Sequence, residues 1–308
     1  MNRRQFLVLA SASAVAAGTK ASAQADVAAA PLISFGLLTD VQYADADPQG
    51  ERHYRESIPK LQAAVADLAK EQLPLTIHLG DVIDRDFASF AVVLPLFQAL
   101  GGPVRYLLGN HDYNVRDAEK GRVVATLGMP HDYYSFSNSG VKFVMLDTTD
   151  VSTYKYPQGS AAAVAAAAVI KQHAAGNPHN AQPSSGGISP AQLAWLEKEL
   201  AAADAAHQPV VVCGHHPLVP ESGHQASNSR EILAVLAGHR CVRAYCCGHN
   251  HAGGQVLVNG VPFITFKSIL HHPQVTSYAV VRLFTDRLVI EGRGREQSRV
   301  IPLAAMAP

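Results

Sequence analysis

Short apolar runs alternate along the chain with longer segments whose apolar residues recur every three or four positions. Five of the runs have the length of buried strands, and a polar loop follows each: residues 32–38, 75–79, 104–108, 210–213 and 242–247. The segment 53–70 places Ile58, Leu61, Val65 and Leu68 on one face of a helix. Alternating strands and helices predict an α/β core with buried, mostly parallel strands.

The second half of the chain adds a helix, two hairpins and an excursion. Ser189 and Gln192 belong to a capping box that opens a helix with its leucines facing inward. Residues 256–266 and residues 278–290 each predict a β-hairpin. An alanine-rich stretch and a following run of Gly, Pro, Asn and Ser predict a helix and a mobile excursion around 158–188, inside the domain that spans 31–308.

The first 23 residues have the three parts of an export signal. Arg3 and Arg4 form a basic start, residues 8–17 are apolar, and residues 21–23 are small. The adjacent arginines resemble a twin-arginine signal, and an ordinary secretory signal is the alternative. The apolar run is shorter than the ~20 residues that span a bilayer. We therefore expect export by the twin-arginine machinery to the periplasm or the exterior, without membrane attachment after the signal is removed.

Composition narrows the function classes. The chain has 308 residues, of which 48% are hydrophobic and 16% charged, as is usual for a globular protein. Loss of Arg3, Arg4 and Lys20 with the signal changes the formal charge from zero to −3. This slightly negative charge of the remaining chain gives no support for binding to nucleic acids or anionic lipids. The four cysteines lack paired spacing and lie in apolar runs, which predicts buried thiols rather than zinc ligands or disulfides.

The abnormal count is 15 histidines, and several fall in loops directly after the predicted strands. Any one short Asp or His motif is weak evidence, but five in order at strand ends are hard to explain by chance. Carboxylate, amide and imidazole side chains together suit a pair of divalent cations, which share a bridging carboxylate and a hydroxide that attacks phosphorus. The motifs are Asp40-Val41-Gln42, Gly80-Asp81-Val82-Ile83-Asp84, Gly109-Asn110-His111-Asp112, Gly214-His215-His216 and Gly248-His249-Asn250-His251.

These motifs resemble those of the calcineurin-like metallophosphoesterase superfamily. The resemblance implies a four-layer αββα sandwich and two metal sites that share one carboxylate. One site would use Asp40, Gln42, Asp81 and His251, and the other Asp81, Asn110, His215 and His249. The position before His216-Pro217 favours His215 as the ligand, and the reverse assignment stays open.

The resemblance also implies a catalytic group beside the metals. His111 would be the acid histidine near the phosphate oxygen, and Asp112 is grouped with it. Asp112 and Asp84 would orient neighbouring side chains.

Gln42 occupies a position where the superfamily usually has histidine. A neutral amide oxygen is a harder donor than imidazole, which favours manganese or magnesium over zinc or iron. This change, together with Tyr43 and further matching segments up to residue 299, resembles the manganese-dependent ADP-ribose/CDP-alcohol diphosphatase subfamily. The chain departs from that subfamily at residues 267–270 and 227–229, and we expect these differences to concern the substrate rather than the metals.

Several side chains are candidates for substrate binding. Tyr43 is either a stacking platform for a nucleobase or a core tyrosine. Arg293 and Arg295 either clamp a diphosphate or lie on a solvated edge. Surface solvation is favoured for Arg52 and Arg55. Asn228 is a candidate for a helix cap first and for a substrate contact second.

The sequence thus predicts an exported hydrolase that binds two divalent ions. Mn²⁺ is the preferred expectation, ahead of Mg²⁺, Fe or Zn²⁺. The expected substrates are small nucleoside diphosphate derivatives such as ADP-ribose or CDP-alcohols, cleaved at the pyrophosphate bond. A phosphomonoesterase or phosphodiesterase of broad specificity is the alternative. A protein-binding scaffold on the same fold would have lost metal ligands, and none is missing from the motifs.

Overall fold

Two six-stranded sheets form the centre of the computed structural model, which describes residues 30–176 and 182–304. The first sheet has the order β14-β13-β12-β1-β2-β3. Its strands are β1 (Ile33–Leu38), β2 (Thr76–His78), β3 (Val104–Tyr106), β12 (Ser277–Leu283), β13 (Arg287–Gly294) and β14 (Arg299–Pro302). The second sheet has the order β10-β11-β9-β8-β5-β4. Its strands are β4 (Tyr134–Asn138), β5 (Val141–Met145), β8 (Val210–Cys213), β9 (Val242–Cys247), β10 (Gly254–Val258) and β11 (Val261–Thr265).

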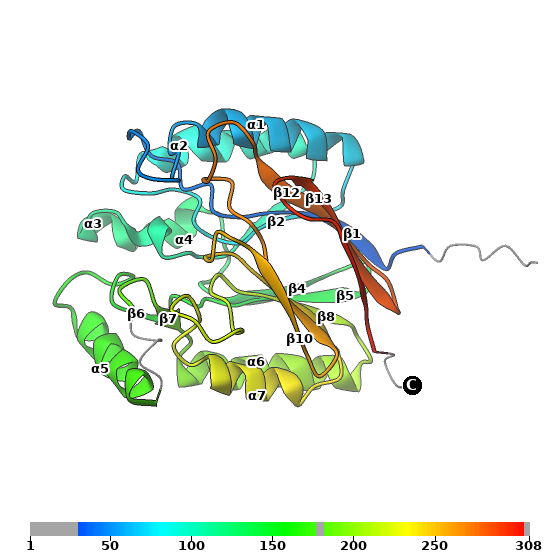
Figure 1. Cartoon of the computed structure of the whole chain (residues 1–308). Helices are drawn as coiled ribbons and strands as arrows, with labels where there is room; N and C mark the ends of the chain where they lie inside the picture. Colours follow the sequence, from blue (N-terminus) through cyan, green and yellow to red (C-terminus); the bar gives the residue numbers. More distant parts are fainter. Residues whose placement is uncertain (1–29, 177–181, 305–308) are drawn as a thin grey trace, which may run out of the picture. The chain divides into compact units, whose positions relative to one another are not determined.

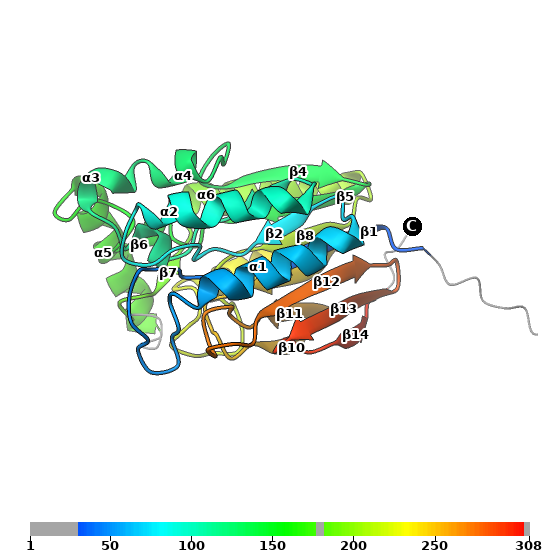
Figure 2. The same ribbon diagram turned by 90° about the horizontal axis from the view of Figure 1, so that it is seen from above.

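Helices cover the outer faces of both sheets. Helix α1 (Ser57–Leu68) and α2 (Ser89–Val93) lie over the first sheet, and α6 (Pro190–Ala205) and α7 (Ser229–Ala237) lie under the second (Figure 1). Seen from above, α1 and α2 run across the top of the stack (Figure 2). The four-layer αββα sandwich predicted from the sequence is therefore confirmed.

The remaining elements are short, apart from α5. They are η1 (Ala69–Glu71), η2 (Leu94–Leu100), η3 (His111–Tyr113), α3 (Asp117–Lys120), α4 (Val123–Thr126), β6 (Val151–Ser152), α5 (Ala161–Gly176) and β7 (Gly186–Gly187). Helix α5 and β7 belong to the predicted excursion, and its mobility stays a prediction. The predicted export signal lies outside the described residues. No helix in the described ranges is both long and apolar enough to cross a membrane.

The prediction of mostly parallel strands is wrong at the outer parts of both sheets. Strands β1, β2 and β3 run parallel, but β12, β13 and β14 pair antiparallel. Likewise β5, β8, β9 and β11 are parallel, whereas β4 and β10 are antiparallel edge strands. Short turns join the antiparallel pairs that are consecutive in the chain, as at the β10–β11 hairpin, while parallel neighbours need long connections. Strand β5, which the sequence analysis missed, completes the parallel part of the second sheet.

Two apolar clusters hold the layers together. The larger lies between the sheets, where Phe35 of β1 meets Phe143 of β5 edge-on with ring centroids 5.3 Å apart. The smaller packs Leu196 and Leu200 of α6 and Ile232 of α7 against the second sheet. All four cysteines are buried free thiols, as predicted. This packing fixes the strands whose ends carry the polar motifs.

One predicted helix cap forms only in part. Ser189 accepts a hydrogen bond from the backbone N–H of Gln192, which begins α6 with Pro190 in its first turn. The side chain of Gln192 does not complete the capping box, because it is fully buried and binds the backbone of Asp147 through both amide atoms, at 2.9 and 3.0 Å. Ser189 is thus predicted correctly as the cap residue, whereas tertiary contacts of Gln192 prevent the second hydrogen bond of the capping box.

Candidate functional site

The five predicted polar motifs follow β1, β2, β3, β8 and β9, at the carboxyl ends of the parallel strands. Their side chains are buried and come together from both sheets. Four of the motif residues have left-handed backbone, with φ of 51° at Asp40, 43° at Gln42, 59° at Asp81 and 63° at His249. This conformation costs a non-glycine residue of the order of 1 kcal/mol or more, and such outliers cluster at functional sites. The backbone of these loops is therefore held by the surrounding structure.

Two glycines allow the motif loops to approach one another closely. A Cβ atom at Gly109 would lie 2.2 Å from Asp81 Oδ1, and one at Gly248 would lie 2.5 Å from Asp40 Oδ2. No side chain fits at these distances. Each carboxylate therefore lies directly against the backbone of a neighbouring motif.

Asp40, Gln42 and His251 form one half of the site. Asp40 Oδ1 lies 3.2 Å from His251 Nε2, and Asp40 Oδ2 accepts from the backbone N–H of His249 at 3.2 Å. The amide nitrogen of Gln42 donates to Asp81 Oδ2 at 2.8 Å and to Asp40 Oδ1 at 3.3 Å. An amide nitrogen cannot ligate a cation, so Gln42 binds metal only after a half-turn of its amide that presents the oxygen.

Asp81, Asn110, His215 and His249 form the other half. His215 Nε2 lies 3.2 Å from both Asp81 Oδ2 and Asn110 Oδ1, and its Nδ1 contacts the carbonyl of Leu79 at 2.8 Å. That carbonyl holds the proton on Nδ1 and leaves the Nε2 lone pair for the site. One possible ligand atom each from Asp81, His215 and His249 lies within 4.8 Å of the other two.

The electrostatics of the cluster favour a bound cation. Burial acts to raise the pKa of Asp40, but His251 outweighs burial and lowers it. Burial acts in the same way at Asp81, where His215 and His111 hold the pKa well below its usual range. Although burial opposes the charge of His215, Asp81 raises its pKa to about 9. The two carboxylates are therefore ionised and attract positive charge.

His249 supplies a separate indication. Its Nε2 is buried and has no hydrogen-bond partner among the described residues. Burial lowers the pKa of His249 well below its usual range, so the ring is neutral. A buried imidazole nitrogen without a partner is costly unless something binds it. Since its neighbours are Asp81 and His215, a divalent cation fits this position.

His111 lies at the open side of the cluster, with 18% of its side chain exposed. Its Nδ1 is 3.0 Å from Asp84 Oδ1, and Asp84 also accepts from Asn114 at 2.6 Å. Burial acts against a charge on His111, but Asp81 and Asp84 outweigh it and raise its pKa. Asp84 thus lies between His111 and Asn114, and its orienting role stays a prediction.

Asp112, which we grouped with His111 as catalytic, has a different position. Its carboxylate is fully buried and accepts from the backbone N–H groups of Gly109 and of residues 81–83, at 2.8 to 3.3 Å. These four bonds occupy its acceptor sites and shape the loop that carries Asp81. Asp112 is therefore a positioning residue out of reach of a substrate, which corrects its place in the catalytic group.

His216 differs from His215 in what its ring contacts. Nδ1 of His216 lies 2.8 Å from Thr148 Oγ1, and Nε2 lies 2.9 Å from the carbonyl of Ser184. Both ring nitrogens are therefore occupied. The geometry agrees with His215 as the ligand and gives His216 a structural role beside the excursion.

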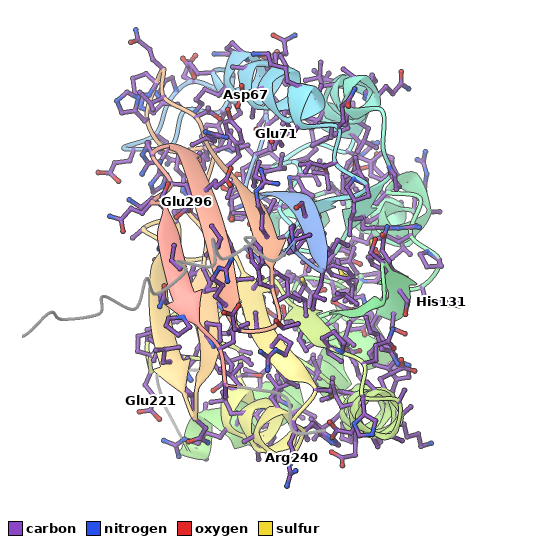
Figure 3. All side chains as sticks on the ribbon, turned by 90° about the vertical axis from the view of Figure 1, so that its right-hand side faces the viewer. Asp67, Glu71, His131, Glu221, Arg240 and Glu296 are labelled. Carbon is purple, nitrogen blue, oxygen red and sulfur yellow. The ribbon has the colours of Figure 1, made fainter. Side chains whose placement is uncertain are left out.

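The two arginines of the predicted clamp, Arg293 and Arg295, contact other groups of the protein. Arg293 contacts the carboxylates of Asp67, Glu71 and Glu291 at 3.2 to 3.9 Å. Figure 3 labels Asp67 and Glu71, which belong to α1 and η1 on the outside of the first sheet. Arg295 donates to backbone carbonyls of residues 268 and 271 at 3.3 and 3.2 Å. Arg293 is thus held by carboxylates, and Arg295 uses Nη1 to hold the segment 268–271, so substrate binding by either arginine stays a prediction.

Arg52 is the arginine that reaches the site. Its Nη1 donates to Gln42 Oε1 at 3.3 Å and lies 3.4 Å from His111 Nε2. The preference for surface solvation is therefore wrong for Arg52, although Arg55 does form exposed ion pairs with Asp45 and Asp47. The helix predicted over 53–70 begins only at Ser57, as α1. The preceding segment pairs instead with residue 271.

Two other candidates can be placed. Tyr43 is half-buried and packs against the larger apolar cluster, so stacking on a nucleobase stays a prediction. Asn228 precedes α7, but its side chain makes no cap. It binds the backbone of Ile188 through both amide atoms, at 3.1 and 2.9 Å, and so secures the excursion beside the site. The cap prediction is wrong because this longer-range contact takes both amide atoms.

Comparison with known proteins agrees with this geometry. The manganese-dependent ADP-ribose/CDP-alcohol diphosphatase of Oryza sativa subsp. japonica is 34% identical over 300 residues, covering 85% of this chain and 91% of the rice protein. The human protein of the same name is 29% identical over 319 residues, covering 88% and 92%. The crystal structure of a dimetal phosphatase from Danio rerio superposes with a TM-score of 0.78 at 26% identity, covering 89% of this chain and all of that one.

The family model described as calcineurin-like phosphoesterase matches residues 33–253. This range includes every motif from Asp40 to His251. The resemblance inferred from the sequence is thus confirmed, and the chain belongs to the calcineurin-like phosphoesterase family.

Proposed function

We propose that the protein is a dinuclear-metal phosphohydrolase that cleaves the pyrophosphate bond of small nucleoside diphosphate derivatives such as ADP-ribose or CDP-alcohols. The observation that carries this proposal is the joining of two ligand clusters in one buried site. Gln42 Nε2, 2.8 Å from Asp81 and 3.3 Å from Asp40, connects them. The names of the relatives from rice and human support the substrate class.

The ligand sets are those expected from the sequence. Asp81 would be shared by the two ions, with Asp40, Gln42 and His251 on one side and Asn110, His215 and His249 on the other. The residues fit divalent ions because two ionised carboxylates meet a buried imidazole nitrogen that has no partner in the described chain. The ions would supply positive charge for the phosphate and a nucleophile generated from water.

The oxygen-rich side of the site favours manganese. Asp40, Asp81, Asn110 and Gln42 contribute oxygen or amide groups, which suit Mn²⁺ or Mg²⁺ better than Zn²⁺. The relatives from rice and human are named as manganese-dependent. In a titration of the protein with metal ions, iron and zinc are the ions to compare with Mn²⁺.

The chain's own groups would complete the reaction centre. His111 lies at the open side with Asp84 on one ring nitrogen, so the other nitrogen can hold or donate a proton toward a phosphate oxygen. Arg52, 3.4 Å from that nitrogen, adds positive charge next to it. Asp112 keeps the Asp81 loop in place through four backbone hydrogen bonds.

The substrate class is tested with the purified protein and Mn²⁺ on four compounds: ADP-ribose, CDP-choline, a cyclic nucleotide and p-nitrophenyl phosphate. The proposal expects a kcat/KM for the first two at least about tenfold above the others, because remote groups of a correct substrate contribute to transition-state binding. Equal values, or a preference for the cyclic nucleotide or p-nitrophenyl phosphate, would support a broad phosphodiesterase or phosphomonoesterase and contradict the proposed specificity.

Export is a second part of the proposal, and it concerns residues outside the described part of the chain. The paired arginines Arg3 and Arg4 support the twin-arginine machinery as a partner and a periplasmic or secreted location. Replacing both with lysine keeps the charge and alters only recognition. We expect precursor to accumulate in the cytoplasm, as cell fractionation would show, whereas unchanged export would indicate the general secretory route.

A further inference from the structure

A segment outside the five motifs, residues 268–272, packs against the Asp40 and His251 half of the site. Two of its backbone N–H groups donate to the carbonyls of Thr39 and Asp40, at 3.2 and 3.0 Å. The segment also carries His271, whose ring meets that of His251 at a steep angle with centroids 4.5 Å apart. One short segment therefore contacts both members of the Asp40–His251 pair.

Two cationic side chains fix the backbone of this segment. The ammonium of Lys60, a residue that is only 2% exposed, donates to the four carbonyls of residues 269–272 at 2.5 to 3.4 Å. Arg295 donates to the carbonyls of residues 268 and 271. Hydrogen bonds from charged donors are stronger than neutral ones, and a buried ammonium without acceptors is costly. The position of His271 is consequently set by the fold.

The contact between the two histidines joins specific atoms. His251 Nδ1 lies 2.8 Å from His271 Nε2, while His251 Nε2 lies 3.2 Å from Asp40 Oδ1 on the site side. A histidine binds metal through a nitrogen that carries no proton, and its other nitrogen then carries the proton and needs an acceptor. In this chain the acceptor next to Nδ1 is the imidazole of His271.

We propose that His271 is a positioning residue of the metal site, which accepts a hydrogen bond from Nδ1–H of His251 and keeps the Nε2 lone pair available for a cation beside Asp40. The inference rests on the proposed function, since it concerns a metal ligand of that site. The proton of His271 then lies on its own Nδ1, which is 3.5 Å from Glu51 Oε2.

The test compares metal binding by wild type, His271→Phe and His271→Glu. Phenylalanine keeps a ring but has no acceptor, so one of two Mn²⁺ sites should weaken about 10- to 100-fold in calorimetric titrations, while the other site is unchanged. A glutamate accepts the same hydrogen bond and should restore most of the affinity. The control is His131→Phe, at an exposed residue that Figure 3 labels, which should bind Mn²⁺ within about twofold of wild type.

Two results would overturn the inference. One is wild-type Mn²⁺ affinity at both sites in His271→Phe, and the other is a His271→Glu protein that binds as weakly as the phenylalanine variant. Failure of the proposed function is distinguishable, because wild type itself would then bind no pair of ions or leave ADP-ribose intact.

A measurement on wild type covers the case of a variant that does not fold. Histidine ¹⁵N shifts of the Zn²⁺-loaded protein should report His251 protonated at Nδ1 and His271 unprotonated at Nε2. The opposite tautomer of either ring contradicts the inference.

Discussion

Arg52 donates from Nη1 to the amide oxygen of Gln42 at 3.3 Å and thereby turns the amide nitrogen of Gln42 toward Asp81, 2.8 Å away. The same guanidinium lies 3.4 Å from His111. Arg52 thus connects Gln42, which stands where the superfamily usually has histidine, with His111, the expected acid. When the amide oxygen of Gln42 turns to a cation, Arg52 loses this acceptor.

The first prediction concerns the metal preference set by Gln42. Gln42→His replaces a neutral amide with an imidazole, which should tighten zinc or iron binding and relax the manganese requirement. Activity as a function of free Mn²⁺ and Zn²⁺ measures both effects, with Gln297→His, on an exposed loop, as the control. The same metal ranking and the same half-saturating Mn²⁺ in variant and wild type would show that Gln42 is not a ligand.

The second prediction concerns Asp81, which contacts both halves of the site through Gln42 and His215. Asp81→Ala removes the expected shared ligand, so kcat/KM should fall at least about a hundredfold and bound metal should decrease. Metal content after dialysis and initial rates measure the two effects. Asp45→Ala removes an exposed carboxylate and should leave both unchanged. A fully metallated and active Asp81→Ala protein contradicts the site assignment.

The third prediction separates His111 from the ligands. His111→Ala should lower kcat by about 100-fold or more, because a proton donor near the phosphate is lost, while metal content stays near that of wild type. Its partner Asp84 would lose the contact at 3.0 Å but keep that with Asn114. If bound metal falls in proportion to activity, His111 is a ligand and not an acid.

The fourth prediction uses the close approach at Gly248. Gly248→Ala would place a Cβ atom 2.1 Å from Thr39 Oγ1 and 2.5 Å from Asp40 Oδ2, so Asp40 must move. We expect Mn²⁺ affinity to fall about tenfold or more. Gly254→Ala is the matched control, since a Cβ there meets nothing within 4 Å. Equal Mn²⁺ affinity of the two variants would mean that Asp40 is not held as the structure indicates.

The fifth prediction concerns the buried ion pair of Lys155 and Asp147, which precedes the excursion in the chain. Lys155 contacts Asp147, whose side chain is fully buried, and Asp132. Lys155→Met leaves the Asp147 charge unpaired and should lower the free energy of unfolding by about 3 to 5 kcal/mol. Adding Asp147→Asn should recover part of that loss. Urea denaturation measures wild type, the two single variants and the double variant, and a double variant as unstable as the sum of the singles would show that the two residues act independently.

The αββα layering was implied by the family resemblance, whereas the residues themselves determined an α/β core and the composition of the metal loops. Strand-length apolar runs ending in Asp, Asn and His motifs predict both, because the carboxyl ends of parallel strands meet and metals need these donors. The hairpin around Asn259 could equally be predicted from the sequence, because its turn is local and residues 259 and 260 both have the positive φ that Asn and Gly adopt. Such local patterns failed where a longer-range contact takes the side chain, as it does at Gln192 and Asn228.

Only the tertiary structure decided which side chains support the site. Arg52 reaches His111 across 59 residues, and Lys60 binds the carbonyls that hold His271 across more than 200. Arg293 is an equally plausible clamp in the sequence, but it lies against Glu71 in the folded chain. A residue's type and local spacing do not encode such partners. They follow from the packing of sheets and helices, which brings together segments that have no common pattern in the sequence.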